Sequence, residues 1–428
     1  MKRVSFSDPD FSSFRAEFDR REDASDDVRQ AVADILATVR RDGDAALVAY
    51  AKKFDGADLD VNGLLVTDEE IAEARAAVDD ELKQAVAASL ENVTAFAQAS
   101  MRKGWETTNA QGVVCGEMFH PLDRVGVYVP GGTAPLVSTA LMTAAIGKAV
   151  GVPEIVVATP CGPDGKINPA LLYAVVESGA TQILRVGGAH GIAAMTYGTE
   201  SVAPVAKLFG PGNKFVVEAK RQVFGTVGVD LIPGPSEVLI LADESCKPEF
   251  VAADLLAQAE HGKESIVVLV SPSANVLDSV EEALNVQRKT LSRQGPIDHV
   301  IANGMIFVQT ENLDQAIDMV NDFAPEHLSL VVEGADELLD RIRTTGAIYV
   351  GNHSPVAVGD FLAGPSHTLP TGGSGKAFPG ITADMFQRRT SYVKCTPESV
   401  AASEPYVSTF ARVEGLDAHG ESVSIRVR

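Results

Sequence analysis

Cysteine is scarce in this sequence and its few copies are scattered. The 428 residues include only four cysteines, Cys115, Cys161, Cys246 and Cys395, and none belongs to a Cys-x-x-Cys pair. This spacing argues against a disulfide framework and against a zinc site made of thiolates. A cysteine that adds to an aldehyde is a known device of dehydrogenases. None of the four stands in a glycine-rich turn beside a histidine, so we expect reduced, structural cysteines.

Basic clusters and long apolar runs are also missing. The formal net charge is −22 and no block of lysine and arginine interrupts it, which excludes a nucleic-acid partner. Lys2 and Arg3 have no apolar stretch behind them, so we expect no secretory signal. The longest uncharged run, 125–147, is broken by proline and glycine, which predicts a strand, a turn and a buried helix instead of a membrane span. We therefore expect a cytoplasmic protein.

What the sequence does contain is a regular alternation of strand and helix patterns. A chain of this length predicts more than one domain. Residues 26–99 have helical spacing, and from residue 125 short apolar runs alternate with helical segments such as 136–150, 169–177 and 213–223. The predicted strands are 125–129, 155–159, 183–186, 207–209, 238–242, 265–270, 305–308, 328–332 and 347–350. This order predicts parallel βαβ units, hence an α/β fold with two Rossmann-like sheets, a helical N-terminal segment and a small C-terminal appendage containing a helix at 398–414.

The expected domain limits follow from the places where glycine and proline interrupt this pattern. A stretch rich in glycine and proline, 225–235, marks the boundary between two α/β units. We expect the parts to be 1–22 as an N-terminal segment, 23–127 with 237–380 as the first α/β domain, 128–236 as the second, and 381–428 as a tail.

One candidate metal site lies on the predicted helix 250–261. Asp254, Gln258 and His261 fall at positions i, i+4 and i+7, which share one helix face. Histidine and aspartate are common zinc ligands, whereas glutamine is uncommon. The alternative is a simple helix end, because Gly262 is a natural C-cap.

Two further acid and imidazole combinations could contribute chemistry. Glu326 and His327 precede a predicted strand, where they could act as a general base and a proton shuttle. They can serve one site only if the backbone turns there, since neighbours in an extended strand point to opposite faces. Asp360 and His367 lie in the loop 354–373, which is too rich in glycine and proline for regular structure. The alternative for Glu326 and His327 is a corner between a helix and a strand that carries a surface acid. The alternative for Asp360 and His367 is a surface loop with a capping aspartate and a solvated histidine.

Glycine-rich turns follow several predicted strands, at 129–135, 186–191 and 209–214. Such turns let backbone amides approach a ligand at the carboxyl edge of a parallel sheet. However, the dinucleotide pattern Gly-x-Gly-x-x-Gly is missing, so the turns alone indicate only an anionic or nucleotide-like ligand. Glu414 and His419, near the C-terminus, read as ordinary surface residues unless the tail reaches another subunit.

Taken together, these motifs resemble the histidinol dehydrogenase family, which catalyses the last step of histidine biosynthesis. The resemblance runs from 43–47 to the tail. Its specific stretches are 126–132, 209–213, 234–239, 258–261, 325–328, 359–360 with 364–367, and 415–419.

The resemblance implies an oxidoreductase that converts L-histidinol to L-histidine through L-histidinaldehyde, with two NAD⁺ and one zinc ion per subunit. It implies a homodimer with shared sites, in which zinc is held by Gln258, His261 and Asp360 of one chain and by His419 of the other. The residues it implies for catalysis are Glu326 and His327. Those it implies at the substrate are Ser236, Gln258, His261, His327, Asp360, His367, Glu414 and His419. Those it implies at NAD are Tyr128, His190 and Asn213.

One position departs from the family pattern, and three other functions remain open at this point. The family usually has glutamine where this chain has His190, which puts the geometry at the cofactor in question. The alternatives are a family relative that oxidises another polar alcohol, such as a sulfonated diol, a zinc hydrolase that needs no NAD⁺, and a metal-stabilised structural protein.

Overall fold

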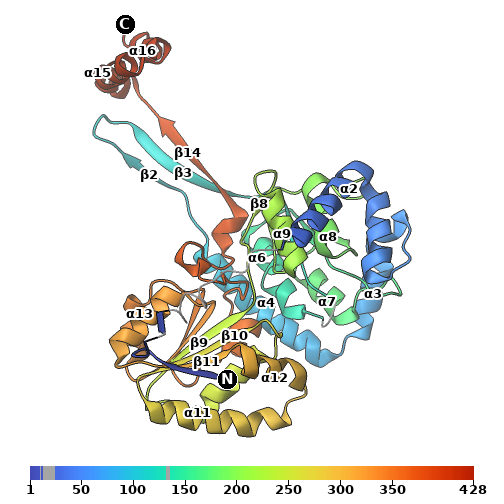
Figure 1. Ribbon diagram of the computed structural model, residues 1–428. Coiled ribbons are helices and arrows are strands. Elements are labelled where there is room, and N and C mark those ends of the chain that lie inside the picture. Colours follow the sequence, from blue (N-terminus) through green and yellow to red (C-terminus); the bar gives the residue numbers. More distant parts are fainter. Residues whose placement is uncertain (10, 13–24, 132–134) are drawn as a thin grey trace.

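Two parallel sheets with helices on both faces make up the body of the molecule (Figure 1). The structure is a computed structural model, and it describes residues 1–9, 11, 12, 25–131 and 135–428. Residues 10 and 13–22 of the predicted N-terminal segment therefore lie outside the described residues, as do residues 132–134 of the glycine-rich turn 129–135. The α/β class expected from the sequence is confirmed.

The larger sheet has six strands and is parallel throughout. Its order is β1 (Lys2–Ser5), β11 (Met305–Gln309), β10 (Ile266–Ser271), β9 (Glu237–Ala242), β12 (His327–Val331) and β13 (Ala347–Val350). Alternate residues of β9 enter different cores: Val238 and Ile240 join one, Leu239 and Leu241 the other. This period of two is what buries a parallel sheet on both faces.

The helices of the larger sheet fall on its two sides accordingly. The helices that share the core of Val238 are α10 (Pro248–Ala259), α11 (Ala274–Gln287) and α12 (Gln294–Asn303). The opposite face is covered by α13 (Leu313–Phe323), through Ala316, Ile317 and Val320.

The smaller sheet has five strands, again all parallel. Its order is β6 (Gln182–Leu184), β5 (Glu154–Ala158), β4 (Arg124–Tyr128), β7 (Lys207–Phe209) and β8 (Gly228–Val229). On one face lie α2 (Asp26–Tyr50), α8 (Gly188–Tyr197) and α9 (Lys214–Val223). On the other lie α3 (Asp68–Ala77), α4 (Asp80–Ser100), α5 (Val137–Leu141), α6 (Ala144–Val150) and α7 (Pro169–Glu177).

The N-terminal helices pack in a way that the expected domain limits do not describe. We expected 23–127 to accompany 237–380, but α2, α3 and α4 share their hydrophobic cores with the smaller sheet, and β4 is one of its strands. The exact limits of the domains stay a prediction.

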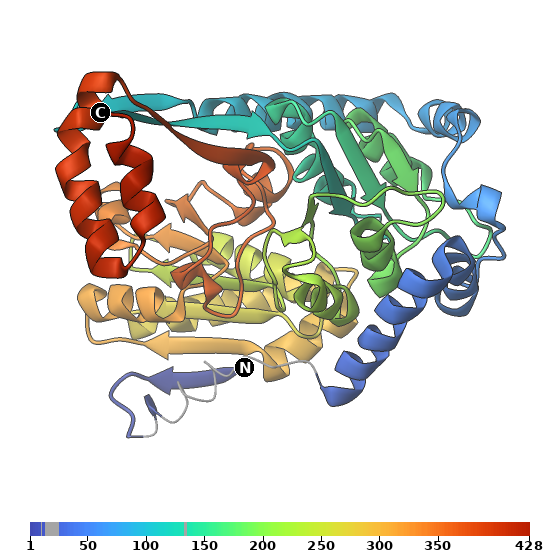
Figure 2. The same cartoon turned by 90° about the horizontal axis from the view of Figure 1, so that it is seen from above.

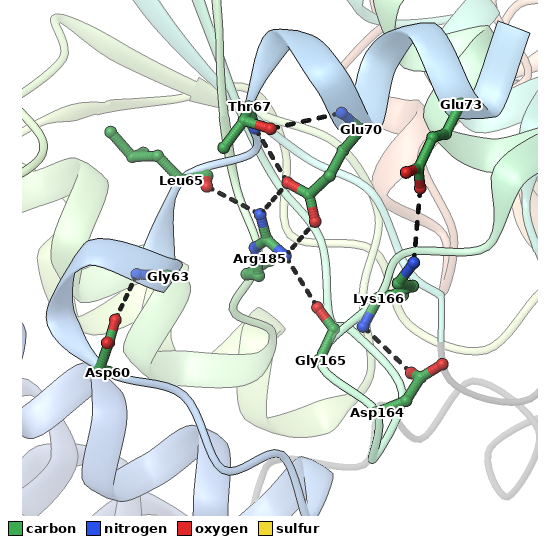
Figure 3. A network of polar contacts seen from close by, with 10 residues as sticks. All are labelled: Asp60, Gly63, Leu65, Thr67, Glu70, Glu73, Asp164, Gly165, Lys166 and Arg185. Atoms are coloured by element: carbon green, nitrogen blue, oxygen red, sulfur yellow. Dashed lines mark hydrogen bonds and ion pairs between the residues drawn. The ribbon is translucent and has the colours of Figure 1, made fainter.

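A buried arginine fastens this N-terminal region to the edge of the smaller sheet (Figure 3). Arg185, just after β6, donates hydrogen bonds to the carboxylate of Glu70 in α3, to the carbonyl of Leu65 at 2.8 Å and to the carbonyl of Gly165 at 2.9 Å. Charge-assisted bonds of this kind are about twice as strong as neutral ones. One side chain thus ties three segments together at the strand end.

A three-stranded antiparallel arm leaves the body and carries the C-terminal helices (Figure 1). Its strands are β14 (Gln387–Lys394), β3 (Val114–Pro121) and β2 (Trp105–Thr108). Seen from above in Figure 2, the arm runs out to α15 (Pro397–Glu414) and α16 (Asp417–Ser424). The predicted tail helix is confirmed, but the arm's strands were not predicted, because β2 and most of β14 are exposed and lack an alternating apolar pattern.

The strands predicted from 125 to 350 are all present, within one or two residues of the expected bounds. In the part of the chain that the structure describes, no helix combines the length and apolar character required to cross a bilayer. The uncharged run 125–147 contains β4, α5 and α6.

A buried ion pair holds the turn that follows β7. Lys220 of α9 and Asp230 are paired and almost fully buried. The Gly210 amide donates to Asp230 at 2.8 Å, and Lys220 donates to the Gly210 carbonyl at 2.8 Å. Gly210 has φ 106°, and a Cβ there would lie 2.1 Å from the carbonyl oxygen of Tyr128. The pair therefore fixes a peptide that only glycine can supply.

Removing one partner of this ion pair should destabilise the protein strongly. Lys220→Met leaves Asp230 buried without its cation, which costs ~3–5 kcal/mol. We expect a clear fall in the urea midpoint of unfolding followed by circular dichroism. Lys214→Met, at an exposed position of the same helix, is the matched control and should change little. Equal midpoints for the two variants would contradict this account.

Candidate active site

The predicted acid and imidazole pair lies where α13 turns into β12. The helix ends at Ala324, whose φ of 53° is positive, and Glu326 lies immediately before the strand that His327 begins. Positive φ is rare for residues other than glycine and costs energy, so it is found where the surrounding structure imposes it. The turn brings His327 Nδ1 to 3.6 Å from Glu326 Oε2. The backbone therefore bends at this point, as it must if the side chains of Glu326 and His327 are to serve one site.

Glu326 is buried and held by two donors. Its Oε2 accepts from the hydroxyl of Ser236 at 2.7 Å and from the amide of Glu237 at 2.8 Å. Burial raises the pKa of Glu326 above its ordinary value, against the lowering effects of His327 and of the two donors. A carboxylate with a raised pKa is a better proton acceptor near neutral pH. The structure thus brings Ser236, predicted at the substrate, directly to the predicted base.

His327 is buried between two carboxylates. Its Nδ1 lies 2.9 Å from the backbone carbonyl of Glu237, which can only accept, so the proton of the neutral ring resides on Nδ1. Its Nε2 lies 3.5 Å from Oδ1 of Asp360. Burial alone would lower the pKa of His327, but the charges of Glu326 and Asp360 outweigh it and raise the pKa to about 9. Nε2 is the atom left to react.

Three more of the predicted residues gather around Asp360 at the end of α14 (Val356–Phe361). The charge of Asp360 acts on the pKa values of both His261 and His367, which burial lowers overall. Gln258 is buried near the end of α10, the helix that contacts α14, and His261 follows two residues after it ends. Taken as a whole residue, His261 keeps an exposed surface in the single chain, although the protein around its imidazole desolvates the ring enough to lower its pKa.

Three buried atoms at this place have no hydrogen-bond partner among the described residues: Oδ1 of Asp360, Nε2 of His327, which lies 3.5 Å from it, and the side-chain amide nitrogen of Gln258. Buried polar atoms are nearly always bonded, so a missing ligand is the natural explanation. The assignment of nitrogen and oxygen in such an amide can be reversed, which would present oxygen instead. Carboxylate, imidazole and amide oxygen suit a divalent cation. Asp360, His261 and Gln258 therefore fit the zinc ion that the sequence predicts.

The fourth predicted ligand does not join the other three within one chain. His419 is exposed on α16, which packs against α15 at the far end of the arm (Figure 1). Glu414 is exposed on α15. Within the described residues, no three or more histidine, cysteine, aspartate or glutamate side chains are grouped closely enough to hold a metal. The single chain offers an incomplete set.

The residues predicted at the cofactor lie at the carboxyl edge of the smaller sheet. Tyr128 ends β4, and its hydroxyl accepts from the amide of Gly188 at 3.1 Å. Burial raises the pKa of Tyr128 to about 12, so the hydroxyl stays protonated. His190 lies in α8 and is buried, 2% exposed. Asn213 is exposed and caps α9 by accepting from the amides of Phe215 and Val216 at 3.0 and 3.3 Å.

One residue of the site escaped the sequence interpretation. Glu237 begins β9, is buried, and accepts from the Gly372 amide at 2.9 Å. Burial raises the pKa of Glu237 to about 7. The signal was available, because an acid at the head of a continuous apolar strand must be buried with it.

Comparisons with known proteins agree with one another. The family model of histidinol dehydrogenase matches residues 18–427. Curated histidinol dehydrogenases are similar to the chain: that of Syntrophotalea carbinolica is 44% identical over 100% of this chain and 99% of its own length. That of Geobacillus kaustophilus is 41% identical over 95% of each chain. The crystal structure of histidinol dehydrogenase from Elizabethkingia anophelis superposes with a TM-score of 0.95, at 34% identity, covering 100% of this chain and 98% of the other. The chain therefore belongs to the histidinol dehydrogenase family.

Proposed function

We propose that the chain oxidises L-histidinol to L-histidine through L-histidinaldehyde, with two NAD⁺ as hydride acceptors, as the last step of histidine biosynthesis. The observation that carries the proposal is the buried pair Glu326 and His327, next to Asp360 and its unsatisfied oxygen, in a chain of this family. The alternative of another polar alcohol has no observation in its favour.

His327 is the proposed base of the alcohol step. Its Nδ1 donates to the Glu237 carbonyl, so Nε2 accepts the hydroxyl proton of histidinol as hydride leaves the carbinol carbon. A base must be neutral to accept a proton. A cation shared by Asp360 would reduce the carboxylate charge that raises the pKa of His327, and would therefore favour the neutral ring.

Glu326 is the proposed base of the aldehyde step. Its carboxylate can take a proton from water that adds to the aldehyde, and the hydrated carbon then gives up the second hydride. The hydrogen bonds from Ser236 and the Glu237 amide lower the pKa of this carboxylate and orient it. Burial of the pair excludes bulk water from the aldehyde.

The proposed zinc ligands are Gln258, His261 and Asp360, completed by His419 of the partner subunit. A bound zinc ion supplies Lewis acidity and a fixed point for the amine and imidazole of the substrate. The remaining proposed substrate contacts are His367 and Glu414. Tyr128, His190 and Asn213 are the proposed contacts to NAD.

A homodimer is part of the proposal, because the tail presents an apolar surface that no described part of the chain covers. Tyr406, Phe410 and Val413 on α15 are 60%, 67% and 74% exposed, and Ile425 after α16 is 59% exposed. Apolar patches of this kind mark interaction surfaces. A partner body beneath the tail would cover them and receive His419. A cytoplasmic location fits the four free thiols.

The stoichiometry of the reaction tests the proposed function. With limiting L-histidinol and excess NAD⁺, we expect about two NADH per substrate, since an alcohol is oxidised to an acid. The measurement is absorbance at the NADH maximum. One NADH would indicate an alcohol dehydrogenase that stops at the aldehyde, and no NADH would indicate another substrate, a hydrolase or a structural protein.

Loss of the tail histidine should empty the metal site. His419→Ala removes the fourth proposed ligand, so we expect zinc content measured by mass spectrometry of the dialysed protein to fall at least tenfold. His353→Ala, a histidine of the larger domain outside the proposed set, should keep its zinc. Normal zinc content in His419→Ala would remove this residue from the site.

Loss of the Ser236 hydroxyl should shift the pH dependence of the reaction. Ser236 lowers the pKa of Glu326, so Ser236→Ala should raise it further. Ionised Glu326 then requires a higher pH, and the acid limb of kcat against pH with histidinaldehyde should move upward. The control is Ser245→Ala, which removes a serine bonded to the carboxylate of Asp243 near the surface. An unmoved acid limb in Ser236→Ala would contradict the assignment.

A further inference from the structure

A π-helical turn ends the first long helix beside the proposed cofactor residues. It spans Ala51–Asp55 directly after α2 and is closed by Gly56, whose φ is 68°. Such wide turns occur mostly where function requires them. The ring of Tyr50 stacks on that of Phe54 at 5.6 Å, and the ring of His190 lies 5.6 Å from the first and 5.9 Å from the second. The turn thus lies against His190.

Buried polar atoms of this cluster lack partners. Oδ2 of Asp55 and both ring nitrogens of His190 make no hydrogen bond with any described residue. An unpaired buried polar group costs about 1–3 kcal/mol, more when it is charged. Because the turn that carries Asp55 lies against His190, unpaired buried atoms on both residues indicate a ligand that supplies the missing bonds.

Nearby cations are engaged elsewhere. Arg185 bonds to Glu70 and to two backbone carbonyls, and Lys52 pairs with Asp58 at 2.8 Å. Lys53 lies over the ring of Phe54. In the part of the chain that is described, Asp55 has no ion-pair partner.

Asp55 faces the ends of two strands of the smaller sheet. Its charge contributes to raising the pKa values of Tyr128, which ends β4, and of Cys161, which follows β5, although burial is the larger cause for both. The tyrosine hydroxyl in turn meets the Gly188 amide at the start of α8, the helix of His190. The carboxylate, the imidazole and the phenol therefore converge at one edge of the sheet.

The chemistry of this cluster selects the kind of group that can bind. A carboxylate accepts hydrogen bonds and repels phosphate, while an imidazole accepts or donates one. Sugar hydroxyls satisfy both, and an acid beside a parallel sheet commonly binds the ribose of a dinucleotide. The exposed ring of Phe54 adds an apolar wall.

We propose that Asp55 is a further NAD-binding residue, whose carboxylate accepts hydrogen bonds from ribose hydroxyls of the cofactor beside His190. This assignment rests on the proposed function, because it requires a dinucleotide at the smaller sheet. It adds a residue from the N-terminal helices to a site otherwise built from residues 128–213.

The test is Asp55→Asn, which keeps the shape and removes the charge. We expect the Kd for NAD⁺ by calorimetry, and the KM for NAD⁺, to rise about tenfold, the effect of one charge-assisted hydrogen bond. The KM for histidinol and kcat should stay within about twofold. Asp58→Asn, the exposed control three residues away, should bind NAD⁺ normally.

Thermal stability separates binding from a structural role. Because Asp55 has no hydrogen-bond or ion-pair partner among the described residues, Asp55→Asn should leave the Tm without NAD⁺ unchanged or higher, and should reduce the rise in Tm that NAD⁺ produces. Asp55→Ser provides a second variant should the first fold poorly. A normal Kd for NAD⁺, or a lower Tm with kcat and both KM values impaired together, would overturn the proposal.

Cofactor analogues identify the hydroxyls. If Asp55→Asn binds NADP⁺ better relative to NAD⁺ than the wild type does, the ribose on the adenine side is the partner. An unchanged ratio together with weaker NAD⁺ binding indicates the nicotinamide side. If Asp55→Asn weakens the binding of NAD⁺ but leaves the Kd for deamino-NAD⁺, which lacks the adenine amine, unchanged, the partner is that amine and the ribose assignment is wrong.

Binding measured without histidinol keeps this inference separate from the reaction. A wild type that binds NAD⁺ through Asp55 but does not oxidise histidinol would sink the proposed function alone. A wild type that does not bind NAD⁺ would overturn both.

Discussion

The pairing of β9 with β12 is the constraint from which the reactive site follows. In this parallel pair His327 lies opposite Val238, which sets the peptide of Glu237 beside the two reactive side chains. The amide of Glu237 donates to Glu326, and the carbonyl of the same residue accepts from His327. One backbone unit therefore orients both the acid and the imidazole. A slip of one residue in the register would turn these groups to the other face.

The two sheets present opposite edges to the chemistry. The reactive pair lies at the amino edge of the larger sheet, where β9, β12 and β13 begin, whereas the proposed cofactor residues lie at the carboxyl edge of the smaller one. The proposed cofactor contacts lie at helix termini and glycine-rich turns of one sheet, and the proposed bases lie at the strand starts of the other. Two separate, regular parts of the fold can therefore position the cofactor and the bases. Catalytic groups on regular elements are positioned more precisely than groups on loops.

The parallel strands and part of the proposed site could be predicted from the sequence. Apolar runs with continuous burial, such as 238–242 and 267–270, identify central parallel strands because both faces are covered. The acid and the imidazole before the predicted strand 328–332 singled out Glu326 and His327, and the resemblance supplied their roles and added Ser236. The exposed strands of the arm and the two-residue strand β8 left no such pattern, so they were missed.

The association of α2 to α4 with the smaller sheet could not be read from local patterns either. It depends on contacts far apart in the chain, such as that between Glu70 and Arg185. Asp55 escaped notice for the same reason: in sequence it is one acid among many on a helical stretch, and only the fold places the neighbouring Phe54 against His190 and the charge of Asp55 near Tyr128. Which polar side chains are buried can be recognised only when the segments that pack against them are known.

The arm has a consequence for how the protein behaves in solution. Its strands have few buried residues, and the helices at its tip carry large apolar side chains on the outside. In the single chain these apolar side chains stay exposed at the end of the arm, where they can contact other molecules. Loss of the proposed dimer contact is thus expected to produce aggregates of mixed size, and a monodisperse monomer would be hard to prepare.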